Sequence, residues 1–205
     1  MLVLVVLGSV RFRYLWSDMR ALLGLLVVTL ILSASMLVLA LNKQNNLWLS
    51  HIDTLIEFCF YVLVFSYWQP SEKVARIFRR EFVLFYGFVW LVSKFSIEKL
   101  EYFDNFSSGL ASVVIMCIAC YTIFNMTNLS RIKSFLDYRF LVLSGTLLYH
   151  FTKIVIYSSG NLILDLPPSA IIKAWSIHWI ATIITYLLYS MAFLLDHGVR
   201  RARLA

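Results

Sequence analysis

The chain has 205 residues, of which 61% are hydrophobic and only 14% charged, and its formal net charge is +7. A soluble domain usually carries about a quarter charged residues, so this composition excludes an ordinary water-soluble globular protein. The mean hydropathy of +0.81 points the same way. The apolar runs do not alternate as outer-membrane strands do, and three prolines and seven glycines leave them few breaks. We therefore expect an all-α fold, a polytopic membrane helix bundle.

Six apolar runs are close to the length of about 20 residues that a helix needs to cross a bilayer. A shorter apolar stretch, residues 1–10, lacks the basic start and cleavage site of a secretory signal and is interpreted as a retained, partial first helix. The bundle is then seven-helix-like, with all spans in one transmembrane domain, residues 1–205. In chain order, the predicted full spans are 21–41, 49–68, 82–97, 109–126, 140–158 and 172–195.

Basic residues are concentrated in every second connecting segment, whereas the other segments hold only Lys43 and Lys99. Basic loops stay in the cytoplasm during insertion, so we expect these segments and the C-terminus on the cytoplasmic side of the plasma (inner) membrane. Trp48, Trp68 and Trp175 lie near predicted span ends, as interfacial aromatic residues do. The basic set contains 13 of the 18 lysines and arginines: Arg11, Arg13, Arg20, Lys73, Arg76, Arg79, Arg80, Arg131, Lys133, Arg139, Arg200, Arg201 and Arg203.

These basic segments have two interpretations. They set the topology and contact anionic lipid headgroups of the bilayer, or they form a docking surface for a cytoplasmic or membrane protein partner. Direct binding of nucleic acid is not expected. The loops are too short to hold a soluble domain, so any function lies in the membrane, at its surfaces, or in a partner.

Several ionisable side chains fall within the predicted spans, where each costs at least about 2.5–3.5 kcal/mol at a helix centre. On the predicted orientation they all lie in the outer half of the membrane, and the inner half contains no comparable cluster. Asp53 and Glu57 are neighbours on one helix face because they are four residues apart. Glu57 and His150 lie at similar depth, about 12 Å from the outer ends of their spans. The full set is His51, Asp53, Glu57, Lys94, His150, Lys153, Lys173 and His178.

Two arrangements of this set remain open. Asp53 and Glu57 could pair with Lys94 and Lys153 as structural ion pairs. Alternatively, the residues line a cavity that opens to the outside and binds a polar or charged ligand, with Tyr149 and Trp179 as possible walls. His51 and Lys173 are interpreted as interfacial residues whose side chains reach the headgroups. The predicted ligand-binding residues are Asp53, Glu57, Lys94, His150, Lys153 and His178.

The sequence contains none of the common catalytic motifs: no G-x-S-x-G, no P-loop, no H-E-x-x-H and no Gly-rich dinucleotide turn. Each histidine is isolated in its span, so an intramembrane zinc hydrolase is only an alternative, and we assign no metal ligand, cofactor or catalytic residue. Cys59, Cys117 and Cys120 all fall in apolar runs. They are interpreted as buried structural thiols because the one C-x-x-C has no second pair.

Residues 45–58, NNLWLSHIDTLIEF, resemble a segment of uncharacterised bacterial membrane proteins with about seven spans. In that family an Asn-rich outer loop leads into a helix with a His and a Thr-x-x-Glu-Phe stretch, and the position of Asp53 is often aromatic. The resemblance implies a sensory or accessory module. We therefore expect a non-enzymatic, receptor-like protein that signals through a cytoplasmic partner. The alternative is a channel- or pore-forming effector, assembled as a homo-oligomer in a toxin or defence system.

Overall fold

The computed structural model describes residues 1–128, 137–158 and 167–204, and within these ranges the regular structure is entirely helical. A 3₁₀ turn, Phe12–Tyr14, follows the first helix, and a π-helical turn, Phe78–Phe82, joins α4 to α5. The helices are α1 (Leu2–Val10), α2 (Ser17–Leu41), α3 (Leu47–Ser66), α4 (Glu72–Ile77), α5 (Val83–Ser96), α6 (Asn105–Asn128), α7 (Tyr138–Ser158) and α9 (Pro168–Leu204).

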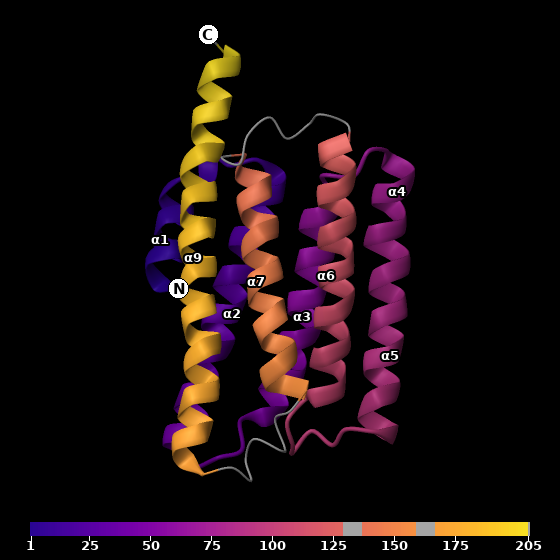
Figure 1. The fold of residues 1–205 in the computed structure, drawn as a ribbon, viewed down its shortest axis with the longest axis vertical. Coiled ribbons are helices and arrows are strands. Elements are labelled where there is room, and N and C mark those ends of the chain that lie inside the picture. Colours follow the sequence, from indigo (N-terminus) through magenta and orange to yellow (C-terminus); the bar gives the residue numbers. More distant parts are fainter. Residues whose placement is uncertain (129–136, 159–166, 205) are drawn as a thin grey trace.

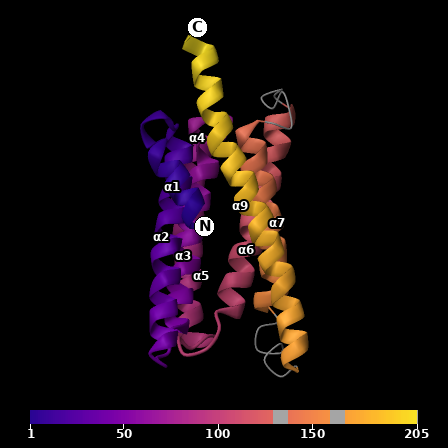
Figure 2. The ribbon, with the colours of Figure 1, turned by 90° about the vertical axis from the view of Figure 1, so that its left-hand side faces the viewer.

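The long helices run up and down the same axis and form one bundle (Figure 1). Residues 11–16 and 67–71 connect helices at the end where α9 finishes, which we call the C-terminal end. Residues 42–46 and 97–104 connect helices at the other end, which we call the distal end. Seen from the side, α1 to α5 form one layer and α6, α7 and α9 form a second (Figure 2). The layers meet mainly where α3 packs on α6, and α1 on α9 and α5 on α6 make smaller contacts.

Five helices are long and apolar enough to cross a membrane, and they coincide with five of the six predicted full spans. The sixth prediction, 82–97, corresponds to α5, whose 14 residues are shorter than a bilayer crossing. The π-helical turn makes α5 continuous with α4, so the helical run starts at Glu72 (Figure 1). Its first turns carry several charged residues, and this is why the apolar part of the run is short.

The predicted partial helix at residues 1–10 is also present. α1 has nine residues, begins at mid-height in the bundle and packs on both α2 and α9 (Figure 1). Gly8 allows α1 to lie directly on α2, since a Cβ atom at this position would be 2.6 Å from Leu23 Cδ1.

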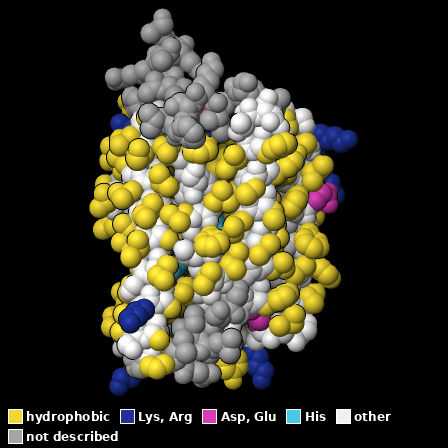
Figure 3. Space-filling view, viewed as in Figure 1, with side chains coloured by type: hydrophobic (Ala, Val, Ile, Leu, Met, Phe, Trp, Pro, Cys, Tyr) yellow, Lys and Arg dark blue, Asp and Glu magenta, His cyan; other side chains and the backbone are white. Residues whose placement is uncertain are grey.

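The outside of the bundle is apolar, and much of the inside is not. Large hydrophobic side chains point outward along α5 and α9, including Phe85, Phe88, Ile180 and Leu187, each at least 59% exposed. The view in Figure 3 shows such side chains over most of this face between the two ends. Exposed apolar surface on this scale is unfavourable in water and favourable against lipid chains. This distribution agrees with a membrane protein.

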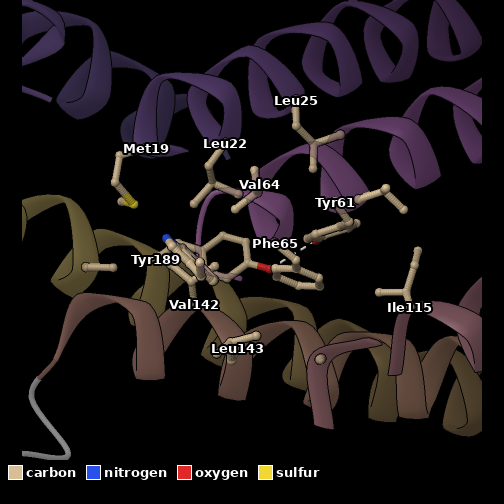
Figure 4. Close-up of a cluster of buried hydrophobic side chains, with 14 of the residues drawn as sticks. Met19, Leu22, Leu25, Tyr61, Val64, Phe65, Ile115, Val142, Leu143 and Tyr189 are labelled. Atoms are coloured by element: carbon tan, nitrogen blue, oxygen red, sulfur yellow. Dashed lines mark hydrogen bonds between the residues drawn. The ribbon is translucent and has the colours of Figure 1, made fainter. Parts of the chain in front are cut away.

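The hydrophobic core lies in the half of the bundle nearer the C-terminal end, where α2, α3, α6, α7 and α9 all contribute (Figure 4). Tyr61 and Tyr189 are embedded in it, and their hydroxyl groups are 3.0 Å apart. Gly145 lets α7 approach α9 closely, because a Cβ atom there would be 2.9 Å from the Tyr189 ring. Thr185 also donates to the Gly145 carbonyl, which fixes the two helices together.

The prediction that all three cysteines are buried is wrong. Cys117 and Cys120 are exposed on α6, Cys59 is partly buried, and all three are free thiols. The inward face of α6 is occupied instead by small or apolar residues such as Ser112 and Ala119, both fully buried. A thiol behaves as a small apolar group, so it is tolerated on the outward face of a membrane helix.

Part of the predicted basic set lies beyond what the structure describes: Arg131 and Lys133 fall in 129–136, and the side chains of Arg200, Arg201 and Arg203 are not described. Two of the others hold the chain together near the C-terminal end. Arg11 donates to the carbonyls of Phe193 and Leu194 on α9, at 3.2 and 3.3 Å. Arg20 donates to the Phe12 carbonyl at 3.2 Å.

Candidate functional site

Glu57 and Lys153 form an ion pair inside the distal half of the bundle. Glu57 lies about 15 Å along α3 from its first residue, and Lys153 lies on the facing helix, α7. Their exposed fractions are only 7% and 3%. The Lys153 ammonium group is also within 5.7 Å of the Tyr149 ring centre and 5.5 Å of the Tyr157 ring centre. A carboxylate and two aromatic faces therefore compensate its charge.

Asp53 lies one turn from Glu57 toward the distal end, on the same face of α3. Thr29 of α2 lies near its carboxylate. Its Oδ1 atom is buried and has no hydrogen-bond partner among the described residues. The predicted pairing of this acid with Lys94 is not present, because Lys94 is bound elsewhere.

Lys94 belongs to a second polar cluster that joins α3, α5 and the start of α6. Its ammonium group lies 2.7 Å from Glu98 Oε2, 2.7 Å from Ser107 Oγ and 2.6 Å from His51 Nδ1. The His51 Nε2 atom lies 3.0 Å from the Tyr102 carbonyl. If Nε2 carries the proton and donates to this carbonyl, Nδ1 is free to accept from Lys94, so one neutral tautomer satisfies both contacts. We call Lys94, Glu98, Ser107 and His51 the distal lock.

The distal lock corrects the interpretation of His51 as an interfacial residue. His51 is fully buried, and Trp90 donates to its backbone carbonyl at 3.0 Å. The Lys94 side chain has its donors directed at three partners within the lock. This cluster therefore has a structural role, because it joins α3, α5 and the start of α6. It does not bring Lys94 to Glu57.

Glu98 caps the N-terminus of α6. Its carboxylate accepts hydrogen bonds from the backbone N–H groups of Phe106 and Ser107 and from the Ser107 hydroxyl. An acid at this position also interacts favourably with the positive end of the helix dipole. Burial raises the pKa of the Glu98 carboxyl, but the hydrogen bonds and the charge of Lys94 outweigh burial, so the pKa is lowered from its ordinary value.

Acidification is expected to destabilise the protein through this cap. Because the pKa of Glu98 is lower in the folded state than in the unfolded state, where it is about 4.3, its contribution is complete above that pH. The contribution is lost as the pH falls through the folded-state pKa. The thermal midpoint in detergent, followed by tryptophan fluorescence, should therefore decrease as the pH is lowered below about 4.5.

Glu98→Gln should make the thermal midpoint depend less steeply on pH, and Glu101→Gln, at an exposed carboxylate in the same loop, should not. An equal slope in Glu98→Gln and the parent would contradict the assignment.

Asp104 is a buried acid that the sequence analysis did not include. It precedes α6, is fully buried, and accepts hydrogen bonds from the hydroxyl groups of Thr54 and Ser50 on α3. It lies in a connecting segment, outside the predicted spans. A signal was present in the sequence, since Asp immediately before a helical run is typical of an N-cap.

The two predicted histidines of the site are both buried, but they have different partners. His150 Nδ1 is 3.1 Å from the Ser112 hydroxyl, and its Nε2 has no hydrogen-bond partner among the described residues. Its ring meets the rings of Tyr61 and Tyr149 edge-on. His178 Nδ1 is 3.0 Å from the Thr152 hydroxyl. Both rings contact the aromatic residues around Lys153, and no hydrogen bond among the described residues joins either ring to Glu57.

A small pocket with a volume of about 20 Å³ lies beside the Glu57–Lys153 pair, between the two layers of the bundle. One acid, two threonines, four tyrosines and two leucines line it. Trp179, a predicted wall residue, is 56% exposed and points outward, so that expectation is wrong. The lining residues are Leu25, Leu26, Thr29, Glu57, Tyr61, Tyr149, Thr185, Tyr186 and Tyr189.

A chain of hydroxyl groups leads from the pocket into the core. Thr146 donates to the Val142 carbonyl at 2.8 Å, so its oxygen must accept from Tyr189 at 2.8 Å. The Tyr189 oxygen in turn accepts from the Tyr61 hydroxyl at 3.0 Å (Figure 4). Tyr61 and Tyr189 are thereby fixed in orientation where they line the pocket.

No protein-family model, curated protein or solved structure matches this chain. Its chemistry must therefore be argued from the site. Within the part of the chain that the structure describes, no three His, Cys, Asp or Glu side chains converge as a metal site requires. The pocket contains one carboxylate beside hydroxyl groups and aromatic rings, an arrangement that favours binding of a small polar molecule.

A second buried acidic group lies near the C-terminal end, where the sequence analysis expected no comparable cluster. Asp18 accepts hydrogen bonds from Trp68 Nε1 at 2.5 Å and the Tyr138 hydroxyl at 3.0 Å. Asp196 accepts from the Trp16 backbone N–H at 3.1 Å. Trp68 is only 5% exposed, so its interpretation as an interfacial anchor is wrong. These contacts tie α2, α3, α7 and α9 together.

Proposed function

We propose that this protein is a non-enzymatic, receptor-like or accessory membrane module that binds a small ligand in the pocket beside Glu57. The observation that carries the proposal is the position of Glu57: it is paired with Lys153 inside the bundle and lines a pocket. Ionisable groups at such depth are expensive and usually mark a functional site. The hydroxyl groups of Tyr61, Tyr149 and Tyr186 supply further polar contacts at the same wall.

In this proposal the C-terminal end faces the cytoplasm, as the basic segments predict, and the pocket lies near the middle of the membrane, with Glu57 and Tyr149 toward its outer side. α9 supplies three pocket residues, Thr185, Tyr186 and Tyr189, and continues past the C-terminal end of the bundle (Figure 1). One helix therefore connects the pocket with the region where a cytoplasmic partner would bind. A ligand that shifts Tyr186 or Tyr189 would move the same helix.

Cysteine labelling tests whether the pocket is open to the outside. In a background without Cys59, Cys117 and Cys120, Leu26→Cys introduces a thiol at the pocket wall without removing a polar group. In sealed vesicles of known orientation, charged thiosulfonate reagents that do not cross membranes are expected to modify this thiol from the outside. Gln44→Cys, at an exposed site near the distal end, is the control for orientation and reactivity.

Modification of Leu26→Cys only from the cytoplasmic side, or from neither side while Gln44→Cys reacts, would overturn the proposed outward-facing pocket. The comparison is independent of which ligand the protein binds in the cell.

A further inference from the structure

We infer that the outward side of α4 and the π-helical turn binds the phosphate headgroup of an anionic membrane lipid, with Arg76 and Arg80 as the residues that hold it. This inference is independent of the pocket and of the proposed function. It rests on the position of the two arginines at the end of a lipid-facing helix and on the contacts of the charged residues around them.

One stripe of exposed side chains continues from the apolar part of α5 onto α4. Arg76, Arg80, Leu84 and Phe88 follow one another at intervals of four residues, so they lie along one side of the helical run. All four are exposed, Leu84 and Phe88 by 62% and 67%. In Figure 3, charged side chains lie at the upper right, the place of α4 in Figure 1, and the surface below them is largely apolar. The arginines therefore belong to the surface that faces lipid.

The π-helical turn aligns the two arginines. Its hydrogen bonds join residues five apart, so it holds more residues per turn than an α-helix, and residues four apart lie almost directly above each other. Ala75 and Phe78, each 5% exposed, keep the opposite side of the run against the bundle, where α4 and the π-helical turn contact α3. One phosphate can then accept hydrogen bonds from both guanidinium groups.

The depth of the arginines matches the headgroup layer of the bilayer. Along the helix axis, Arg80 lies about 6 Å beyond Leu84, and Arg76 about 12 Å beyond it. A headgroup layer is about 5–8 Å thick, and arginine side chains are long enough to reach its phosphates from either side. Because helical side chains lean toward the N-terminus of their helix, the Arg80 side chain leans away from the hydrocarbon and toward Arg76.

The acids nearby leave this positive charge largely uncompensated. Glu72 is paired with Arg79. Glu81 lies 3.7 Å from the Nε atom of Arg80, but both side chains are more than 60% exposed, and such a pair is weak. Arg76 has no ion pair in the described part of the chain. Exposed basic groups at the end of a lipid-facing helix attract anionic headgroups.

Quenching by spin-labelled lipids tests the site. In a background without the native cysteines, Ile77→Cys carries a fluorophore beside Arg76, and Phe95→Cys carries the same fluorophore on the same helical run at the distal end; both sites are exposed. The bilayers consist mainly of phosphatidylcholine. At Ile77→Cys, a small fraction of spin-labelled phosphatidylglycerol should quench at least about threefold more than spin-labelled phosphatidylcholine. At Phe95→Cys the ratio should be close to one.

Charge-removing variants locate the binding groups. Arg76→Gln with Arg80→Gln should bring the quenching ratio at Ile77→Cys close to one. The matched control is Lys43→Gln with Lys99→Gln, which removes two exposed positive charges near the distal end and should leave the ratio unchanged. All four side chains are exposed, so these variants should fold as the parent does.

A ratio near one in the parent, or a high ratio that persists in Arg76→Gln with Arg80→Gln, would overturn the inference. Inorganic phosphate, compared with chloride at the same ionic strength, should leave the ratio unchanged. If phosphate abolishes the preference, the arginines bind free phosphate, and the assignment to a lipid is wrong.

Discussion

Replacing Glu57 with glutamine is expected to lower the free energy of unfolding by about 3–5 kcal/mol, because it leaves the Lys153 ammonium group buried without a counter-charge. Lys153 is 3% exposed, and Glu57 is its only ion-pair partner in the described structure. The two tyrosine faces near Lys153 compensate only part of the lost attraction. Equilibrium unfolding in mixed detergent micelles, followed by tryptophan fluorescence, measures the change.

The double variant Glu57→Gln with Lys153→Met distinguishes the effect of breaking the ion pair from the effect of removing the carboxylate at the pocket. Methionine fills a similar volume without a charge, so the double variant should regain most of the stability that Glu57→Gln loses. Glu72→Gln is the matched control, since Glu72 forms an exposed ion pair with Arg79 and should change stability by less than about 1 kcal/mol. Additive effects of the two single substitutions would contradict a direct Glu57–Lys153 interaction.

This expectation also determines which substitution can test ligand binding. A loss of function in Glu57→Gln would be ambiguous, because the variant is expected to be unstable. Glu57→Gln with Lys153→Met strands neither buried charge, so it is the variant in which a loss of function can be assigned to the site.

The sequence predicts the helical architecture well because the physical signal is local. A bilayer span requires a continuous apolar run, and five such runs correspond to helices that meet this requirement. The depth of Glu57 along α3 and of Lys153 along α7 follows from the helical rise, and this made their pairing one of the two predicted arrangements.

The partners of the other buried groups could not be predicted in the same way, because they lie outside the apolar runs. Glu98 and Asp104 come from a connecting segment, and Asp18 lies in the first turn of α2, before the predicted span begins. Each is buried by contacts between segments distant in sequence, such as Asp18 with Trp68 and Tyr138. A span predicted from hydropathy ends at the first charged residues, whereas the helix in the structure continues through them.

Replacing Lys94 with methionine is the second substitution with a large expected effect. It removes the ammonium group that Glu98, Ser107 and His51 share, and it leaves a carboxylate of 6% side-chain exposure uncompensated. A loss of about 3–5 kcal/mol in the free energy of unfolding is expected. Lys173→Met is the control, because Lys173 is exposed and should change stability by less than about 0.5 kcal/mol.

The two buried lysines differ in what else they should affect. Lys94 points into the distal lock and does not line the pocket, so Lys94→Met should leave the rate of outside labelling of Leu26→Cys unchanged at a temperature where the variant is folded. Lys153→Met combined with Glu57→Gln, which alters the pocket wall, should change this rate. If Lys94→Met instead changes the rate while folded, the separation between lock and pocket is wrong.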